Sequence, residues 1–432
     1  MENSLLIKNA RLSDARVLNI FCREGRIRSV GAESPGAERI IEAGGRWLMP
    51  GIIDVHTHIR DMELSHKEDW ASASASAARG GVTSLCDMPN TRPATFDLPS
   101  LEAKWAAARK SLVNYGVNFG VTENNHRQIE QARGINALKM FMAESSAGYV
   151  VQQPGVIRRV LRLSQKLNKP LMVHSELQSC VEEHHKRYSH DMAHHHLLRH
   201  RECAIEATRL LLQLQKEEGG YLYIAHVATA EEAAMIAAAK AAGQTVWFEV
   251  TPHHLFLNTG HLKNNGNIGK VNPPIRDASD NRALQQALID GHVDTIGTDH
   301  APHTLEEKNK PYDQAPSGFP GLETSLALML RLVHEGRISR ERLEELMCRR
   351  PAEIFGIKDR GCVREGAWAD LIIIDEEKSW TVDPAAFFTK ARYSPFAGMR
   401  LRGAVVTTIV NGRPVWHEGR LHPSKGMQLE YR

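Results

Sequence analysis

The strongest constraint on the fold is a regular alternation of short apolar strands and amphipathic helices between about residues 50 and 355. Strands that alternate with helices are joined by crossover connections, which produce parallel sheets. Eight such units predict an α/β fold, most simply a (β/α)₈ barrel. A doubly wound open sheet is the alternative, although no glycine-rich fingerprint follows the first strand. The predicted strands are 52–58, 82–88, 116–121, 137–142, 171–174, 221–226, 246–251 and 295–299.

The predicted helices lie between these strands, at 67–79, 101–112, 156–167, 197–216, 230–242 and 282–289. Ser65 is followed three residues later by Glu68, which is the pattern of a capping box. We therefore expect the first helix to begin near Ser65. The glycine pairs Gly80-Gly81 and Gly219-Gly220 predict helix ends.

The two ends of the chain predict a different structure. Residues 3–49 and 362–432 contain short strand-like segments with turn pairs at Glu24-Gly25, Glu365-Gly366 and Asn411-Gly412. Asn-Gly between two apolar runs is a strong hairpin signal. We therefore predict a composite β-sandwich domain of residues 1–50 and 362–432, beside a barrel domain of residues 51–361.

Composition excludes several classes of protein. The chain has 432 residues, and its net charge of +3 is too small to favour nucleic acid or an anionic membrane as a partner. It has no signal-peptide pattern and no apolar run of transmembrane length, so we expect a soluble, cytoplasmic protein. The cysteines form no Cys-x-x-Cys pair, which predicts reduced thiols rather than a disulfide framework. They are Cys22, Cys86, Cys180, Cys203, Cys348 and Cys362.

Ionisable side chains recur at the ends of the predicted strands. His56 and His58 are two residues apart in an extended strand and therefore point to one face. His174, His226 and Asp299 end three further strands. Because the carboxyl ends of all strands in a barrel surround one mouth, we expect these five side chains to converge there. Imidazoles with a carboxylate suit a divalent metal of the zinc class. The alternative is five unrelated core residues.

Lys139 lies in the apolar run 137–142, where a buried ammonium is costly. Burial lowers the pKa of a lysine, and the neutral amine could take up CO₂ to form a carbamate that bridges two cations. The alternative is a lysine that reaches the rim and pairs with Glu144. The residues alone do not decide between the two.

Together these motifs resemble the binuclear amidohydrolases that cleave cyclic amides, and within that group the dihydroorotases. The resemblance extends from about residue 46 to 356 and implies a barrel with a small sandwich built from both termini. It also implies a hydrolase that interconverts L-dihydroorotate and N-carbamoyl-L-aspartate in pyrimidine biosynthesis. The matching motifs are His-x-His-x-Arg at 56–60, Leu-Lys-Met-Phe at 138–141, His-Ser-Glu at 174–176, Ala-His-Val-Ala-Thr at 225–229 and Thr-Asp-His-Ala-Pro-His at 298–303.

The resemblance implies two Zn²⁺ ions per chain. His56, His58 and Asp299 would bind the more buried ion, and the other two histidines would bind the second. Lys139, carboxylated, would bridge the ions. Asp299 would also be the catalytic residue that moves the proton. The implied ligand set is His56, His58, Lys139, His174, His226 and Asp299.

The resemblance also implies a substrate site. Arg60, Asn90 and His303 would hold the substrate carboxylate, for which a guanidinium is a natural partner. Asn272 and the backbone of Pro320 and Gly321 would contact the ring.

Each of these side chains has a simpler interpretation from the residues alone. Arg60 could pair with Asp61 or Glu63, Asn90 could cap the following loop, and Asn272 could be a turn residue beside two prolines.

The substrate is the least determined part of this interpretation. Dihydroorotases commonly carry Pro-Gly after the Arg-Asp pair, whereas Met62 and Glu63 occupy those positions here. A hydantoinase (dihydropyrimidinase) or an allantoinase is therefore an alternative, and a non-catalytic partner of aspartate transcarbamoylase is a third. The expected partners are a small-molecule substrate and further copies of the chain in a dimer or tetramer, with aspartate transcarbamoylase association left open. Residues 184–200 contain seven histidines, which we interpret as a solvated loop and helix start, with a secondary metal site as the alternative.

Overall fold

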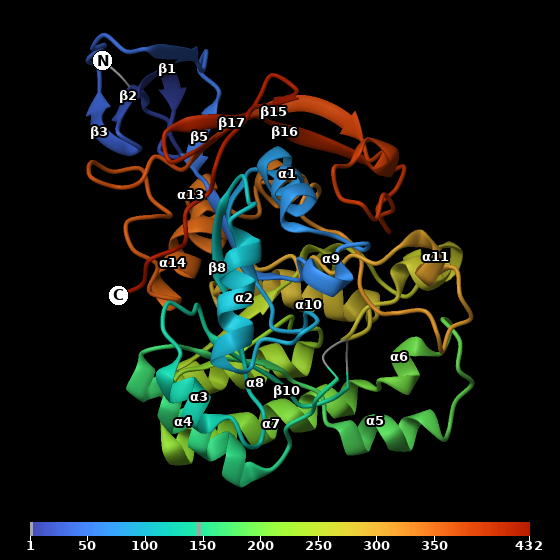
Figure 1. The fold of residues 1–432 in the computed structure, drawn as a ribbon. Helices are drawn as coiled ribbons and strands as arrows, with labels where there is room; N and C mark the ends of the chain where they lie inside the picture. The colour runs from blue at the N-terminus through green and yellow to red at the C-terminus, as the bar shows by residue number, and fades with distance from the viewer. Residues whose placement is uncertain (1–2, 145–147) are drawn as a thin grey trace.

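The computed structural model describes residues 3–144 and 148–432 and has a closed parallel barrel at its centre (Figure 1). Parallel pairing joins the barrel strands in two consecutive runs, β6 through β8 and β9 through β14. Asn118 is the single residue between β8 and β9. A bridge between Thr57 and His300 joins the first strand to the segment after the last one. The predicted (β/α)₈ barrel is therefore confirmed. Its strands are β6 (Ile52–Thr57), β7 (Val82–Asp87), β8 (Asn114–Val117), β9 (Phe119–Gly120), β10 (Leu138–Phe141), β11 (Leu171–His174), β12 (Leu222–Ile224), β13 (Val246–Val250) and β14 (Thr295–Ile296).

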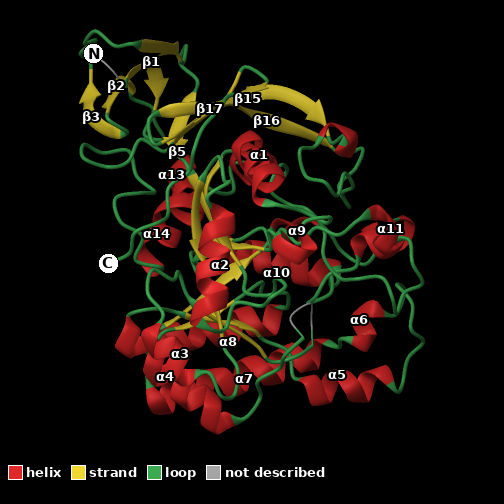
Figure 2. Ribbon diagram, viewed as in Figure 1, coloured by secondary structure: helices red, strands yellow, loops and turns green. Residues whose placement is uncertain are grey.

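Helices cover the outside of the barrel (Figure 2). Among the described residues, none of these helices combines the length and apolar character needed to span a membrane. The α-helices of the described residues are α1 (Trp70–Gly80), α2 (Leu98–Ala108), α3 (His126–Gln131), α4 (Pro154–Leu167), α5 (Gln178–His185), α6 (His195–Leu198), α7 (Arg201–Glu218), α8 (Ala230–Ala241), α9 (Pro252–Phe256), α10 (Ala278–Ile289), α11 (Leu305–Lys308), α12 (Ser325–His334), α13 (Arg340–Glu344) and α14 (Arg350–Ile354). The short 3₁₀ and π turns are η1 (Met62–Leu64), η2 (His261–Asn264), η3 (Gly266–Gly269), η4 (Glu345–Arg349) and η5 (Pro384–Ala386).

The predicted start of the first helix at Ser65 is wrong. The residue that caps α1 is Asp69, whose side chain accepts a hydrogen bond from the backbone N–H of Ser72 in a reciprocal capping box. Ser65 instead ends the short turn η1. Glu68 does not cap a helix from Ser65, because its carboxylate bonds the hydroxyls of Ser72 and Thr389. The predicted helix end is confirmed, since Gly81 caps α1 with a left-handed φ of 83°.

Strands from both ends of the chain form a second sheet, seen in blue and red beside the barrel in Figure 1. β5 and β15 join the two halves by antiparallel pairing. The Asn411-Gly412 hairpin is confirmed, because Val410 pairs with Arg413. The residue boundaries of the two predicted domains stay a prediction. The strands are β1 (Ser4–Arg11), β2 (Val17–Arg23), β3 (Arg26–Gly31), β4 (Arg39–Glu42), β5 (Trp47–Pro50), β15 (Leu371–Thr381), β16 (Arg400–Val410), β17 (Arg413–His417) and β18 (Arg420–Leu421).

The expectation that all six cysteines are reduced thiols is wrong for one pair. Cys180 in α5 and Cys203 in α7 form a disulfide, with their Cα atoms 5.3 Å apart. This separation suits a disulfide, but the two cysteines are 23 positions apart in the sequence, so no local motif reveals the contact. The other four cysteines are free.

Gly80 at the end of α1 is a position where a side chain would collide with the backbone. A Cβ there would lie 2.1 Å from the carbonyl oxygen of Leu322, whereas a Cβ at Gly155 in α4 would meet nothing within 4 Å. We expect Gly80→Ala to lower the free energy of unfolding by about 1–3 kcal/mol. Gly155→Ala, the control, should leave it unchanged or slightly higher. Urea denaturation measures both, and equal stabilities would contradict the collision.

Candidate metal centre

The four predicted histidines lie at the carboxyl ends of their strands and meet at one end of the barrel. His56 belongs to β6 and His58 follows it, His174 ends β11, and His226 follows β12. The ring centroid of His56 lies 5.6 Å from that of His58 and 5.2 Å from that of His226. Those of His174 and His226 are 4.8 Å apart. All four side chains are buried.

Asp299 completes a group of three potential ligands. Its Oδ1 lies 3.0 Å from Nε2 of His58 and 3.3 Å from Nε2 of His56. One ligand atom from each of the three residues lies within 4.8 Å of the others. Asp299 has a φ of 47°, which is strained for a residue other than glycine. The chain therefore holds this carboxylate in a bent segment just beyond β14.

Three of the histidines have their other ring nitrogen held by an oxygen acceptor. Histidines that bind metals usually show this arrangement, because the second hydrogen bond fixes the tautomer and orients the ring. It leaves Nε2 of His56, Nε2 of His58 and Nδ1 of His174 directed at the centre. The pairs are His56 Nδ1 with Glu249, His58 Nδ1 with Asn90 Oδ1 at 2.6 Å, and His174 Nε2 with Glu176 Oε2 at 2.8 Å.

His174 and His226 form a second pair of potential ligands. Nδ1 of His174 lies 3.0 Å from Nε2 of His226. Among the described residues, the buried Nδ1 of His226 has no hydrogen-bond partner. Two imidazole nitrogens that face one another can both bind a cation placed beside them.

Lys139 is fully buried in β10, and its Nζ has no hydrogen-bond partner among the described residues. The ammonium therefore does not pair with Glu144. Its Nζ lies 4.9 Å from the centroid of the Phe141 ring. Burial lowers the pKa of Lys139 to about 8, so a neutral amine is accessible near physiological pH.

Burial also sets the charge of the other ligands. It lowers the pKa of His58 to about 3 and shifts those of His174 and His226 downward as well. For Asp299, burial raises the pKa, but the neighbouring His56 and His58 outweigh it and hold the pKa well below the usual value. Neutral imidazoles and an ionised carboxylate are the forms that bind a metal.

These donors fit a zinc-class centre. They are nitrogen and oxygen atoms that converge on a small cavity, and two of its buried polar atoms, Lys139 Nζ and His226 Nδ1, have no protein partner among the described residues. The cavity is lined by His56, His58, Lys139, Phe141, His174, His226, Val271, Asn272, Asp299, Ala301, Ser317 and Gly318.

Arg60 lies beside this cluster and is 2% exposed. Its Nε donates to the carbonyl oxygen of Pro302 at 3.1 Å, and Nη2 lies 3.0 Å from Nε2 of His303. Among the described residues, Arg60 forms no ion pair with a carboxylate. The alternative pairing with Asp61 is absent, because Asp61 pairs with Lys110 at 2.8 Å. Burial lowers the pKa of Arg60, which reflects an incompletely compensated charge.

The remaining predicted substrate residues occupy different environments. Asn90 bonds His58, so it orients a candidate ligand. Asn272 lines the cavity, and its buried Oδ1 has no hydrogen-bond partner among the described residues. Pro320 and Gly321 lie just after Ser317 and Gly318, which line the cavity. The backbone N–H of Gly321 donates to Nδ1 of His300 at 3.2 Å.

The sequence interpretation missed three buried residues that support the ligands. Glu249 in β13 bonds His56 and accepts from the backbone N–H of His226 at 3.1 Å. Arg199 donates to Glu176 at 2.6 Å. Burial raises the pKa of Glu176, but the guanidinium of Arg199 and the ring of His174 together outweigh burial and lower the pKa below its usual value. One sequence signal could have revealed Glu249: a glutamate is unusual within an apolar strand such as 246–250.

Comparisons with known proteins identify the family of this chain. The amidohydrolase family profile matches residues 47–415. A dihydroorotase of Anaeromyxobacter dehalogenans strain 2CP-1 is 35% identical over 97% of this chain and 99% of its own length. A dihydroorotase of Halobacterium salinarum is 35% identical over 95% of this chain and 96% of its own length. The solved L-hydantoinase (dihydropyrimidinase) of Arthrobacter aurescens is 33% identical, covers 99% of both chains and superposes with a TM-score of 0.95.

Proposed function

Because the chain belongs to the amidohydrolase family, we propose that it catalyses the dihydroorotase reaction. This is the reversible hydrolysis of L-dihydroorotate to N-carbamoyl-L-aspartate, a step of pyrimidine (UMP) biosynthesis. In the hydrolytic direction the ring C–N bond breaks, the oxygen of water adds to the carbonyl carbon, and a proton is delivered to the ring nitrogen. Dihydroorotases of Anaeromyxobacter dehalogenans and Halobacterium salinarum are among its relatives.

One observation carries the choice of substrate: the buried guanidinium of Arg60 forms no ion pair with a carboxylate among the described residues. A buried unpaired charge is costly, so a site that retains one is suited to an anionic ligand. Dihydroorotate brings a carboxylate, whose geometry matches a guanidinium. Hydantoin and allantoin carry no carboxylate.

The donor set suits two Zn²⁺ ions. His56, His58 and Asp299 would hold one ion, the remaining two histidines the other, and Lys139 as a carbamate would bridge both. When bound, the ions supply an activated water and polarise the amide carbonyl.

The side chains of this chain then position the substrate and move the proton. Asp299 accepts a proton from the attacking water and returns it to the leaving ring nitrogen, acting first as base and then as acid. Fixing the substrate carboxylate places the carbonyl carbon over the attacking oxygen. The residues assigned to the carboxylate are Arg60, Asn90 and His303, and those assigned to the ring are Asn272, Pro320 and Gly321.

Ring opening of dihydroorotate, a 5-substituted hydantoin and allantoin, measured side by side, tests the proposal. We expect the highest kcat/KM for dihydroorotate. A higher value for hydantoin would instead favour the second candidate, an L-hydantoinase, which the solved relative and the unusual Met62-Glu63 pair support. Purified protein without bound metal and without turnover of any of the three would favour a non-catalytic partner.

Arg60→Met separates recognition of the carboxylate from catalysis. We expect it to lower kcat/KM for dihydroorotate about 30- to 3,000-fold, the equivalent of about 2–5 kcal/mol, because it removes the partner of a buried charge. Hydrolysis of a hydantoin without a carboxylate should change much less. Steady-state kinetics on both substrates, with Arg133→Met as the surface control, provide the measurement. An equal loss of kcat/KM on both substrates would show that Arg60 does not recognise the carboxylate.

The remaining expectations extend the same proposal. We propose a cytoplasmic enzyme that forms a homo-oligomer, a dimer or tetramer, and we test it for association with aspartate transcarbamoylase. Light scattering after size-exclusion chromatography, with and without that protein, distinguishes these assemblies.

A further inference from the structure

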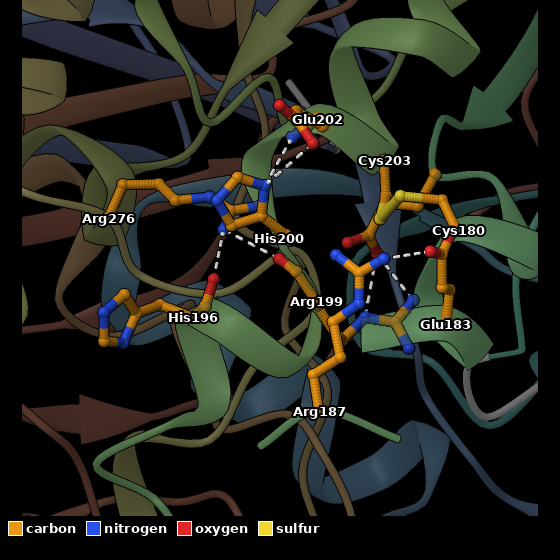
Figure 3. The surroundings of a disulfide bond; sticks show 10 residues. Cys180, Glu183, Arg187, His196, Arg199, His200, Glu202, Cys203 and Arg276 are labelled. Atoms are coloured by element: carbon orange, nitrogen blue, oxygen red, sulfur yellow. Dashed lines mark hydrogen bonds and ion pairs between the residues drawn. A yellow bond between two sulfur atoms is a disulfide. The ribbon is translucent and has the colours of Figure 1, made fainter. Parts of the chain in front are cut away.

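A second group of potential metal ligands lies where α5 and the start of α7 meet (Figure 3). Cys180 and His184 belong to α5, Cys203 belongs to α7, and His200 caps the N-terminus of α7. One ligand atom from each of Cys180, His184 and Cys203 lies within 4.8 Å of the others. His200 joins this group through His184, because their ring centroids are 4.6 Å apart. None of these residues belongs to the centre at the strand ends.

The sequence spacing directs each pair toward a common point. Cys180 and His184 are four residues apart on one helix, so they share a face. His200 and Cys203 are three residues apart at the start of the next helix. Two sulfur and two nitrogen ligands, delivered in close pairs from two segments, form the Cys₂His₂ set of tetrahedral zinc sites.

Burial provides an independent observation. His184 is 7% exposed, and among the described residues its buried Nδ1 has no hydrogen-bond partner. Buried polar atoms are rarely left unsatisfied, because the loss of solvation is costly. Cys203 is fully buried beside it.

His200 can supply the fourth ligand atom. Its Nδ1 accepts a hydrogen bond from the backbone N–H of Glu202 at 3.4 Å, so binding an ion through Nε2 requires the ring proton to move from Nε2 to Nδ1 and this capping bond to break.

We propose that Cys180, His184, His200 and Cys203 bind one Zn²⁺ ion when the Cys180–Cys203 disulfide is reduced. A dithiol reductant supplies two electrons and two protons, so that the S–S bond becomes two thiols and the dithiol becomes a disulfide. Zinc then binds the two thiolates with release of two protons. Oxidation by a disulfide of the same class reforms the S–S bond and releases the ion.

The change between the two forms requires side chains to move. The sulfurs separate once the bond is broken. The rings of His184 and His200, which stack at an interplanar angle of 7°, must rotate so that a nitrogen of each faces the ion. Rotation of a histidine ring about χ2 is soft, since this torsion has broad minima.

The disulfide links α5 to α7 next to Arg199, and the proposed zinc site would do the same. Arg199 immediately precedes His200, and its guanidinium holds Glu176, the partner of His174. Arg276 also fixes this turn, because its Nη1 donates to the carbonyl oxygens of His196 and Arg199 (Figure 3). The proposed ion would therefore stabilise the turn that carries Arg199.

Cobalt spectroscopy on the full-length protein tests the site without relying on activity. The centre at the strand ends offers only nitrogen and oxygen ligands, so a thiolate-to-cobalt charge-transfer band reports on the cysteine site alone. The protein is reduced with dithiothreitol, desalted without oxygen and titrated with Co²⁺. We expect a near-ultraviolet band that saturates and then disappears when Zn²⁺ is added. Unreduced protein should give no band, and absence of the band after reduction would overturn the proposal.

Variants assign the band to these four residues. Cys203→Ser should abolish it, whereas Cys362→Ser should leave it intact. His184→Ala keeps both cysteines and should weaken Co²⁺ binding at least tenfold, while the neighbouring His185→Ala should not. A band that persists unchanged in Cys203→Ser or His184→Ala would refute the assignment.

Discussion

Asp299→Asn is expected to lower kcat for dihydroorotate by about 10²- to 10⁴-fold while leaving most of the bound metal in place. The amide keeps an oxygen at the ligand position, but it cannot accept a proton at neutral pH, and this range is the usual contribution of general acid–base catalysis. Steady-state kinetics and elemental analysis of the same preparation measure the two effects separately.

The position of Asp299 explains why the two roles can be separated. Its Oδ1 lies within 3.3 Å of His56 and His58, so the replacement oxygen stays within reach of the same ion. Asp290→Asn, an exposed change at the end of α10, should behave as wild type. Wild-type turnover in Asp299→Asn would contradict proton transfer by Asp299. Equal loss of metal and activity would show that metal binding is its dominant role.

The strand ends could be predicted because local sequence determines them. β11 has the predicted limits, since a buried parallel strand requires only a short apolar run. β14 is shorter than predicted and covers Thr295–Ile296 alone, because the chain then bends toward Asp299. The alternation of strands and helices was enough to place every predicted ligand at one end of the barrel.

Contacts between residues far apart in sequence could not be predicted. Glu249 reaches His56 across 193 residues. Ser65 was the predicted start of the first helix, but Asp69 caps it, and Glu68, the expected partner of Ser65, bonds Thr389, which is 321 positions away in the sequence. The break between α6 and α7, where one helix was predicted, places Arg199 against Glu176. Such partners are fixed by tertiary packing, which leaves no periodic pattern in the sequence.

Lys139→Ala is expected to remove about one zinc ion per chain and to lower kcat by at least about 10²-fold, because it removes the proposed bridge between two ions that together contribute several kcal/mol. A short-chain carboxylate such as propionate should restore part of both, since it can occupy the space of the missing carbamate. Elemental analysis and turnover as a function of propionate concentration measure this rescue.

Lys169→Ala is the control that separates loss of the proposed carbamate from loss of a buried lysine in general. Burial also lowers the pKa of Lys169 to about 8, but this side chain lies over the Tyr431 ring, 4.0 Å from its centroid, just before the start of β11. Lys139 lies within β10, and its side chain lines the ligand cavity. Both amines can therefore be neutral, and only position distinguishes them. Lys169→Ala should keep its metal and show no response to propionate, and rescue of Lys169→Ala or full metal content in Lys139→Ala would contradict the bridging role.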